Sequence, residues 1–204
     1  MGFLKKLRKR DDRFARVAKS KAAKRDAKAY NKHYFAARNE AERIYMTRER
    51  SRFLAQLSYI VAIRDTFGFG IKRLSNVVSK AVGTADCCNI DKLFTLKELR
   101  DQLELETGYD VPLDDYIEGD FAFQETKHTV DEVTVFYLWA LNDLYKMRKR
   151  RLAHAYAACE QVSKTFSHDA SQVYKMTKEI WDAGLHMRFH SKPVIEIAKE
   201  IAGM

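Results

Sequence analysis

The sequence predicts an all-α protein: a helical bundle of two helical units preceded by a long basic N-terminal helix or arm. Only two prolines and eight glycines occur among 204 residues, and both residue types are disfavoured inside helices. Apolar residues recur at spacings of three and four in several segments. No segment shows sustained alternation with period two, apart from a short piece near residues 121–123. We therefore expect helices almost throughout.

Composition limits the class of protein further. Hydrophobic residues at 46% and charged residues at 32% exclude a collagen-like or wholly disordered chain. Cys87, Cys88 and Cys159 give neither a disulfide framework nor the spacing of a zinc site. No stretch approaches the roughly 18 apolar residues that a membrane span needs. We therefore expect a cytoplasmic protein with no bound metal, no cofactor and no membrane partner.

Residues 1–52 form the first predicted region, a basic helical arm. They contain 18 Lys and Arg against 6 Asp and Glu, a net charge of +12, whereas the other 152 residues carry −3. Neither Gly nor Pro occurs from Phe3 to Phe67, so a long helix is expected. Its first part has few apolar residues and can bury little surface. We expect it to project, or to fold on a partner.

The second predicted region, residues 53–128, is the first helical unit. Over residues 53–67 apolar side chains recur at helical spacing, which places this segment in the core. The two glycines of Phe67-Gly-Phe-Gly70 end the helix, because glycine readily adopts the backbone of a tight turn. The segment from Ile71 to Val82 then forms another helix, which Gly83 stops.

A capping box starts the third helix of this unit. In Thr95-Leu-Lys-Glu98 the threonine hydroxyl and the glutamate carboxylate each accept a hydrogen bond from a free amide at the helix start. The helix runs to about residue 107, and Gly108 is its C-terminal stop. An acidic connection follows. Between Asp86 and Thr134 the chain has 14 acidic and 4 basic residues, a net charge of −10.

Residues 129–204 form the third predicted region, the second helical unit. A second capping box, Thr129-Val-Asp-Glu132, starts a long helix that continues through the basic stretch 146–151 to about Ser163. The remaining signals predict two shorter helices, with Ser167 or Ser171 as the first cap, Gly184 as its stop, Ser191 with Pro193 as the second start and Gly203 as the final stop.

Two segments 78 residues apart suggest an internal duplication. Residues 62–74 and 140–152 are identical at four positions and similar in type at two others. Each segment follows an apolar helical stretch and precedes a further helix. This pattern favours two related helical units packed together, with the basic arm outside them. Chance agreement between helical segments is the alternative.

The first of these segments resembles a known group of proteins. The pattern Ala62-x-x-Asp65-x-Phe67-Gly-Phe-Gly-x-x-Arg73-Leu74, followed by a Thr-capped helix that ends in Glu-Thr-Gly, is similar to small uncharacterised helical proteins of phages of Gram-positive bacteria. The resemblance covers about residues 58–111. It implies a phage or prophage origin, and hence the host-cell cytoplasm, and it supplies no catalytic residues. The second segment lacks both glycines and departs from the pattern.

Basic side chains are the candidate binding residues. Lys and Arg that neutralise phosphates release counterions, which favours binding to a polyanion. Aromatic residues among the arm's cations are suited to stacking on unpaired bases. A second basic cluster covers residues 146–151, and Arg73 occupies the position equivalent to Arg151. The candidate nucleic-acid-binding residues are Lys5, Lys6, Arg8, Lys9, Arg10, Arg13, Arg16, Lys19, Lys24, Arg25, Lys28, Arg73, Lys149, Arg150 and Arg151.

The glycine-containing turn admits two further interpretations. Phe67-Gly-Phe-Gly70 lacks the Lys-Ser/Thr of a P-loop and follows no strand, so it is not a phosphate-cradling loop. Residues 60–82 fit a helix–turn–helix weakly, since the usual small residue before the turn is not clearly placed. In that arrangement Lys72, Arg73 and Asn76 would face a nucleic-acid groove.

The acidic segment offers an alternative mode of binding, in which carboxylates imitate phosphates toward a protein partner. The candidate partner-binding residues are Asp110, Asp114, Asp115, Glu118 and Asp120. The opposite charges of the arm and the acidic segment also predict self-association, so a homo-oligomer stays open.

These patterns lead to one expected function and one alternative. We expect a non-enzymatic, phage-encoded protein that binds DNA or RNA, or a nucleic-acid-bound machine, through its basic N-terminal helix. The alternative is an interaction protein that inhibits a host defence or nucleic-acid-processing factor. An enzyme is not expected, because no nucleophile–base or carboxylate-pair arrangement can be assembled from linear spacing. No catalytic residue or metal ligand is assigned.

Overall fold

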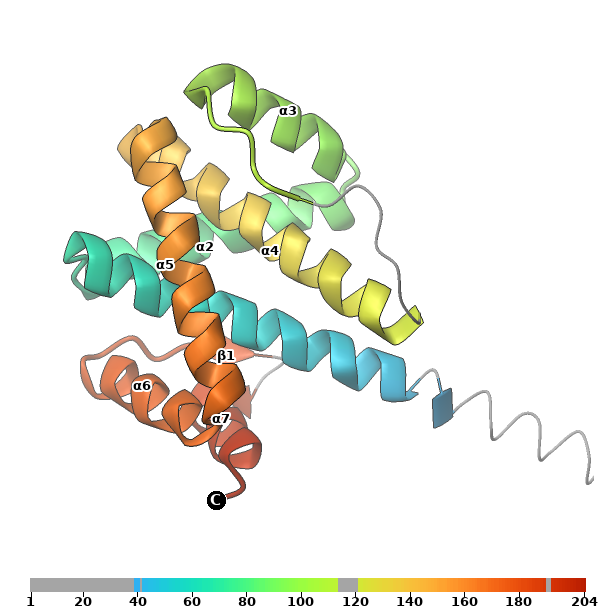
Figure 1. The fold of residues 1–204 in the computed structure, drawn as a ribbon, viewed down its shortest axis with the longest axis vertical. Helices are drawn as coiled ribbons and strands as arrows, with labels where there is room; N and C mark the ends of the chain where they lie inside the picture. Colours follow the sequence, from blue (N-terminus) through green and yellow to red (C-terminus); the bar gives the residue numbers. More distant parts are fainter. Residues whose placement is uncertain (1–38, 41, 114–120, 190–191) are drawn as a thin grey trace, which may run out of the picture. The chain divides into compact units, whose positions relative to one another are not determined.

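A computed structural model describes residues 39–40, 42–113, 121–189 and 192–204 (Figure 1). The chain divides into two compact units, residues 1–46 and residues 47–204. In the first unit only residues 39–40 and 42–46 are described, and they are helical. All the candidate binding residues of the arm, from Lys5 to Lys28, therefore lie outside the described residues.

The second unit is all-α, as the sequence predicts, apart from one short strand pair. Residues 47–67 form its first helix, here called the 47–67 helix. The other elements are α2 (Ile71–Asn89), α3 (Leu96–Thr107), α4 (Phe121–Tyr145), α5 (Lys149–His168), α6 (Ser171–Asp182), β1 (Arg188–Phe189), β2 (Lys192–Pro193) and α7 (Val194–Ala202). β1 and β2 pair antiparallel, with Arg188 opposite Pro193. The sequence did not predict this pair, and the strand expected near residues 121–123 is the first turn of α4.

The core of this unit lies between the 47–67 helix and α4, which run side by side in the same general direction (Figure 1). Leu57, Ile60 and Ile63 are buried at the spacing that the sequence predicted. At the centre, Tyr59 stacks on Tyr137 with ring centroids 5.2 Å apart and an interplanar angle of 24°. Because both rings are almost fully buried, this contact joins the two long helices.

Several predicted helix ends agree with the structure. The capping box is present: the Glu98 amide donates to the Thr95 hydroxyl (3.2 Å), and the Thr95 amide donates to the Glu98 carboxylate (2.7 Å). The Thr95 hydroxyl also donates to this carboxylate at 3.0 Å, and the hydrogen bonds from the Thr95 amide and hydroxyl lower the pKa of Glu98. Gly108 and Gly203 follow α3 and α7 with the positive φ that favours glycine, 71° and 70°.

Two predicted helix boundaries are wrong because the core continues past them. α2 passes through Gly83 to Asn89, and its buried face continues with Thr84 and Cys88. That burial outweighs the roughly 1 kcal/mol that glycine costs inside a helix. Likewise, Thr129 does not start a helix, since α4 already includes Phe121. The Thr129 hydroxyl instead donates to the Glu125 carbonyl at 2.8 Å, a bond that threonine often makes within helices.

The predicted continuous helix from residue 129 to Ser163 is interrupted. α4 ends at Tyr145 and α5 begins at Lys149. Between them Lys146 has φ of 52°, and Met147 is buried at 3% exposure. The favourable burial of the Met147 side chain offsets the cost of interrupting the helix at this point. Neither serine that the sequence offers as a cap precedes α6: Ser167 lies in α5, and Ser171 is the first residue of α6, after the N-cap Ala170. The Ser171 amide donates to the Asp169 carboxylate at 2.9 Å.

The interruption repeats the Phe67-Gly-Phe-Gly turn 78 residues later. The equivalent positions are Phe67 and Tyr145 at the helix ends, Gly68 and Lys146 with φ of 62° and 52°, Phe69 and Met147 in the core, Gly70 and Arg148 as extended N-caps, and Ile71 and Lys149 at the next helix starts. The two segments that the sequence aligns therefore have the same backbone course. Each segment continues into a long helix, α2 or α5, and the next helix along the chain, α3 or α6, has 12 residues in both cases.

The two repeats pack reciprocally, as a two-fold rotation requires. From the first repeat, α2 and α3 both pack on α4. From the second repeat, α5 and α6 contact the 47–67 helix: His154 lies 6.1 Å from the Phe67 ring, and Glu179 pairs with Arg64 at 3.4 Å. Repeats stacked by translation would place the later helices on the far side of α4. We therefore describe the two repeats as related by a pseudo-two-fold axis.

Exchanging the residues at the two positive-φ positions is expected to change stability in opposite directions. Gly68→Ala should lower the free energy of unfolding by about 1 kcal/mol, and Lys146→Gly should raise it by up to about 1 kcal/mol, because a side chain disfavours left-handed backbone. An added Cβ at Gly68 meets no atom within 4 Å, so the effect is conformational. Urea unfolding of the variants measures it.

Gly70→Ala is the matched control for this pair. Gly70 has φ of −73° and equally open space around a Cβ, so its replacement should change stability by less than about 0.5 kcal/mol. A loss of stability in Lys146→Gly would contradict the assignment of the interruption as a second copy of the glycine turn.

Candidate nucleic-acid interface

The repeated turn places basic side chains at two equivalent helix starts. α2 begins with Ile71-Lys72-Arg73, and α5 begins with Lys149-Arg150-Arg151. All five basic side chains are exposed. We call the two helix starts, each with its cations, the basic turns. Neither helix has an acidic residue in its first turn or a side-chain cap. Cations beside the positive end of a helix are unfavourable by several tenths of a kcal/mol, so helix stability does not account for them.

The two basic turns lie at the same end of the long helices. The Phe69 ring packs edge-to-face on Tyr145, with centroids 4.8 Å apart. The Tyr145 hydroxyl donates to the backbone carbonyl of Arg73 at 3.3 Å. Since Tyr145 ends α4 just before α5 begins, the start of α2 is held next to the start of α5. Figure 1 shows both connections at this end of the bundle. The sequence could not place these segments together except through the duplication.

Few acidic groups compensate this charge. Within the described residues, Lys72, Arg73, Lys149, Arg150 and Arg151 form no ion pair. Two more exposed cations flank them. Lys146 lies 4.0 Å from Asp143, a carboxylate that also pairs with Lys80 at 2.6 Å. Arg148 donates to the backbone carbonyl of Glu106. Among the described residues, cations therefore outnumber their carboxylate partners at this end of the unit.

An acidic surface borders the basic end on α3. Glu98, Asp101, Glu104 and Glu106 are exposed on this helix. Gln102 and Asn142 donate hydrogen bonds to Glu106 and lower its pKa, so this carboxylate stays charged at neutral pH. Among the candidate partner-binding residues, Asp110 is exposed and pairs with Arg100 at 3.1 Å. The other four, Asp114, Asp115, Glu118 and Asp120, lie outside the described residues.

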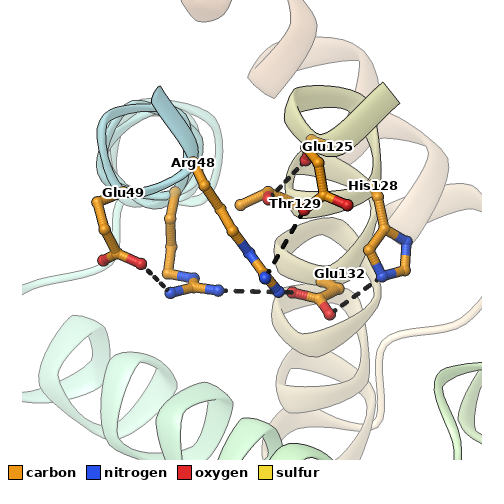
Figure 2. A network of polar contacts seen from close by, with 7 residues as sticks. Arg48, Glu49, Glu125, His128, Thr129 and Glu132 are labelled. Atoms are coloured by element: carbon orange, nitrogen blue, oxygen red, sulfur yellow. Dashed lines mark hydrogen bonds and ion pairs between the residues drawn. The ribbon is translucent and has the colours of Figure 1, made fainter. Parts of the chain in front are cut away.

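A second polar network joins the start of the 47–67 helix to α4 (Figure 2). Glu132 is its centre, with a side chain only 8% exposed. Guanidinium nitrogens of Arg48 and Arg52 lie 3.9 and 3.7 Å from its carboxylate, and the imidazole of His128 lies at 3.4 Å. Arg48 also lies 3.7 Å from Glu125. Glu49 completes the network through a 2.6 Å contact with Arg52. Because its charged groups are paired with one another across the two helices, we interpret this cluster as a packing feature rather than a ligand site.

The network was missed in the sequence, although its residues have a regular spacing. Arg48 and Arg52 are one helical turn apart, and Glu125 and Glu132 are two turns apart, so each pair lies on one helix face. Linear spacing does not say that the two faces meet. Their contact explains why residues 47–52, which the sequence assigns to the arm, belong to the second compact unit.

Other kinds of site find no support in the described part of the chain. There, no group of three or more His, Cys, Asp or Glu residues is placed to hold a metal ion. None of the helices that can be described combines the length and the apolar character needed to cross a bilayer. Comparison of the chain with family models, curated proteins and solved structures finds no match. The interface must therefore be interpreted from its own geometry.

Proposed function

We propose that this protein binds nucleic acid non-enzymatically, with the basic turns and the cations of the arm contacting phosphates. One observation carries the proposal: five exposed cations, none of them ion-paired with another described residue, occupy two equivalent helix starts at one end of the long helices. Such a concentration of charge is unfavourable for the protein alone. A polyanion offsets that cost, because each neutralised phosphate releases bound counterions.

The mechanism is electrostatic positioning. Lys72, Arg73 and the three cations of α5 project from rigid helices that the core holds in place. Free backbone amides at the same helix starts add partial positive charge. This mode of binding requires no reacting group, and a binding protein rather than an enzyme is therefore what we propose. A phage origin stays a prediction.

The experiment is fluorescence anisotropy of labelled DNA and RNA with the full chain across a salt series. Lys149→Gln, Arg150→Gln and Arg151→Gln together should weaken binding by about 10- to 100-fold at low salt. They should also reduce the slope of log K against log salt by up to about 3, roughly one per lost phosphate contact. This triple variant keeps the buried residues of α5 unchanged.

The matched control removes the same charge elsewhere, at exposed cations on the far end of α5, on α6 and on β1: Lys164→Gln, Lys175→Gln and Arg188→Gln. The proposal expects a much smaller loss from the control. Equal losses in the two triples would show that only net charge matters and would overturn the site. Absence of binding to any nucleic acid would overturn the function and favour the alternative, an inhibitor that acts through its acidic segment.

A further inference from the structure

The two basic turns are copies of one local structure. Each pair of equivalent cations, Lys72 with Arg150 and Arg73 with Arg151, occupies the second and third positions of its helix. The next residue is a buried leucine in both helices, Leu74 at 1% and Leu152 at 0% exposure. The fold therefore presents the same pair of cations twice, on the same anchored backbone.

The two copies are related by the pseudo-two-fold rotation described above. The contacts of α3 and α6, the third helix of each repeat, follow the same relation. Arg64 pairs with Glu179 of α6 at 3.4 Å. Asn142, the counterpart of Arg64 in the second repeat, donates to Glu106 of α3 at 2.6 Å. Each long helix thus contacts the third helix of the other repeat through the same position. The basic turns occupy equivalent positions in the two repeats, so the same pseudo-two-fold axis relates them to each other.

We infer that the nucleic acid bound by the basic turns is a duplex, oriented with one of its two-fold axes along the pseudo-two-fold axis of the protein. The inference rests on the proposed function and specifies its ligand. A duplex has two antiparallel backbones, and a two-fold protein meets equivalent phosphates on both strands. A single strand has one direction, so it cannot give two rotated copies of a site equivalent contacts.

The aromatic residues at this end of the protein give an independent reason. Single-strand binders stack bases on accessible aromatic rings. Here Phe69 is buried at 6% exposure, and it packs against both Phe67 and Tyr145. The guanidinium of Arg73 lies 5.5 Å from the Phe69 ring. Phe67 and Tyr145 are half-buried, so the rings at this end pack largely against protein groups. This packing favours contact of the cations with a phosphate backbone over stacking of bases.

The test compares a labelled duplex with a single strand of the same number of phosphates, using the full chain. Duplex binding should be at least about tenfold tighter, as charge density and paired contacts both favour it. The decisive measurement is this duplex-to-single-strand ratio in a variant of the basic turns. The ratio should fall toward one when all four equivalent cations are neutralised, in Lys72→Gln, Arg73→Gln, Arg150→Gln and Arg151→Gln.

Two controls make the outcome specific. Neutralising four exposed cations away from this end should leave the ratio unchanged, in Lys164→Gln, Lys175→Gln, Arg188→Gln and Lys199→Gln. The two half-variants, K72Q/R73Q and R150Q/R151Q, should each weaken duplex binding by the same factor, within about twofold. Circular dichroism and urea unfolding establish that every variant is folded.

The possible failures are distinguishable. If the single strand binds as tightly as the duplex and its binding still depends on the basic turns, the proposed function stands and the duplex inference is wrong. The same holds if one half-variant accounts for the whole loss. If neither form of nucleic acid binds, both proposals are wrong.

Discussion

Leu152→Ala is expected to lower the free energy of unfolding by about 2–5 kcal/mol, the cost of a cavity in a packed core. Leu152 is 0% exposed at the fourth position of α5. Its counterpart Leu74 is 1% exposed at the fourth position of α2. Because both leucines hold a helix start on the core between the long helices, Leu74→Ala should have a cost of similar size.

Urea unfolding followed by circular dichroism measures both costs. Leu105→Ala is the matched control, since Leu105 lies on α3 with 80% exposure, and its replacement should change stability by less than about 0.5 kcal/mol. A cost below about 1 kcal/mol for either buried leucine would mean that the helix start beneath the basic turns is not anchored as described.

The fold was predictable where local signals and core packing agree. The capping box at Thr95 and the glycine at position 108 act within one helical turn, so they can be identified without knowledge of tertiary contacts. Gly83 and Thr129 carry the same kinds of signal, yet α2 and α4 continue through them. At these two positions the long-range burial of neighbouring side chains outweighs a local preference of about 1 kcal/mol.

The interruption at Lys146 shows the opposite error, a helix end that no local signal marks. A lysine with φ of 52° is unusual, and good helix formers surround it. Only the alignment with Gly68, 78 residues earlier, indicates a turn here. The duplication was therefore more informative about this boundary than residue propensity. The alignment indicates that Met147 is buried in the same way as Phe69, and residue propensity carries no such information.

The candidate site was predictable in part for the same reason. The alignment of Arg73 with Arg151 predicts that two basic segments are equivalent. The contact of Tyr145 with Phe69 and Arg73, which places them at one end, depends on how the repeats pack. The network around Glu132 depends wholly on such packing, since neither helix face is complete without the other.

Removing the charge at the centre of that network should therefore be costly. Glu132→Gln is expected to lower the free energy of unfolding by about 1–3 kcal/mol. Breaking a buried ion pair costs about 3–5 kcal/mol, but the side chains of Arg52 and Arg48 are 25% and 36% exposed, so water partly screens them. Glu196→Gln, an exposed position on α7, should change stability by less than about 0.5 kcal/mol.

A double-mutant cycle separates the ion pair from other consequences of the substitution. Arg52→Gln alone leaves Glu132 with Arg48 and His128 as its remaining partners within 4 Å in the described structure. If the two side chains interact, Arg52→Gln should cost less in the Glu132→Gln background than in the native chain, by about 0.5 kcal/mol or more. Strict additivity would mean that Arg52 and Glu132 do not interact, which leaves Arg48 as the residue that joins this segment to Glu132. Coupling would show that the Arg52–Glu132 ion pair helps to hold residues 47–52 on α4.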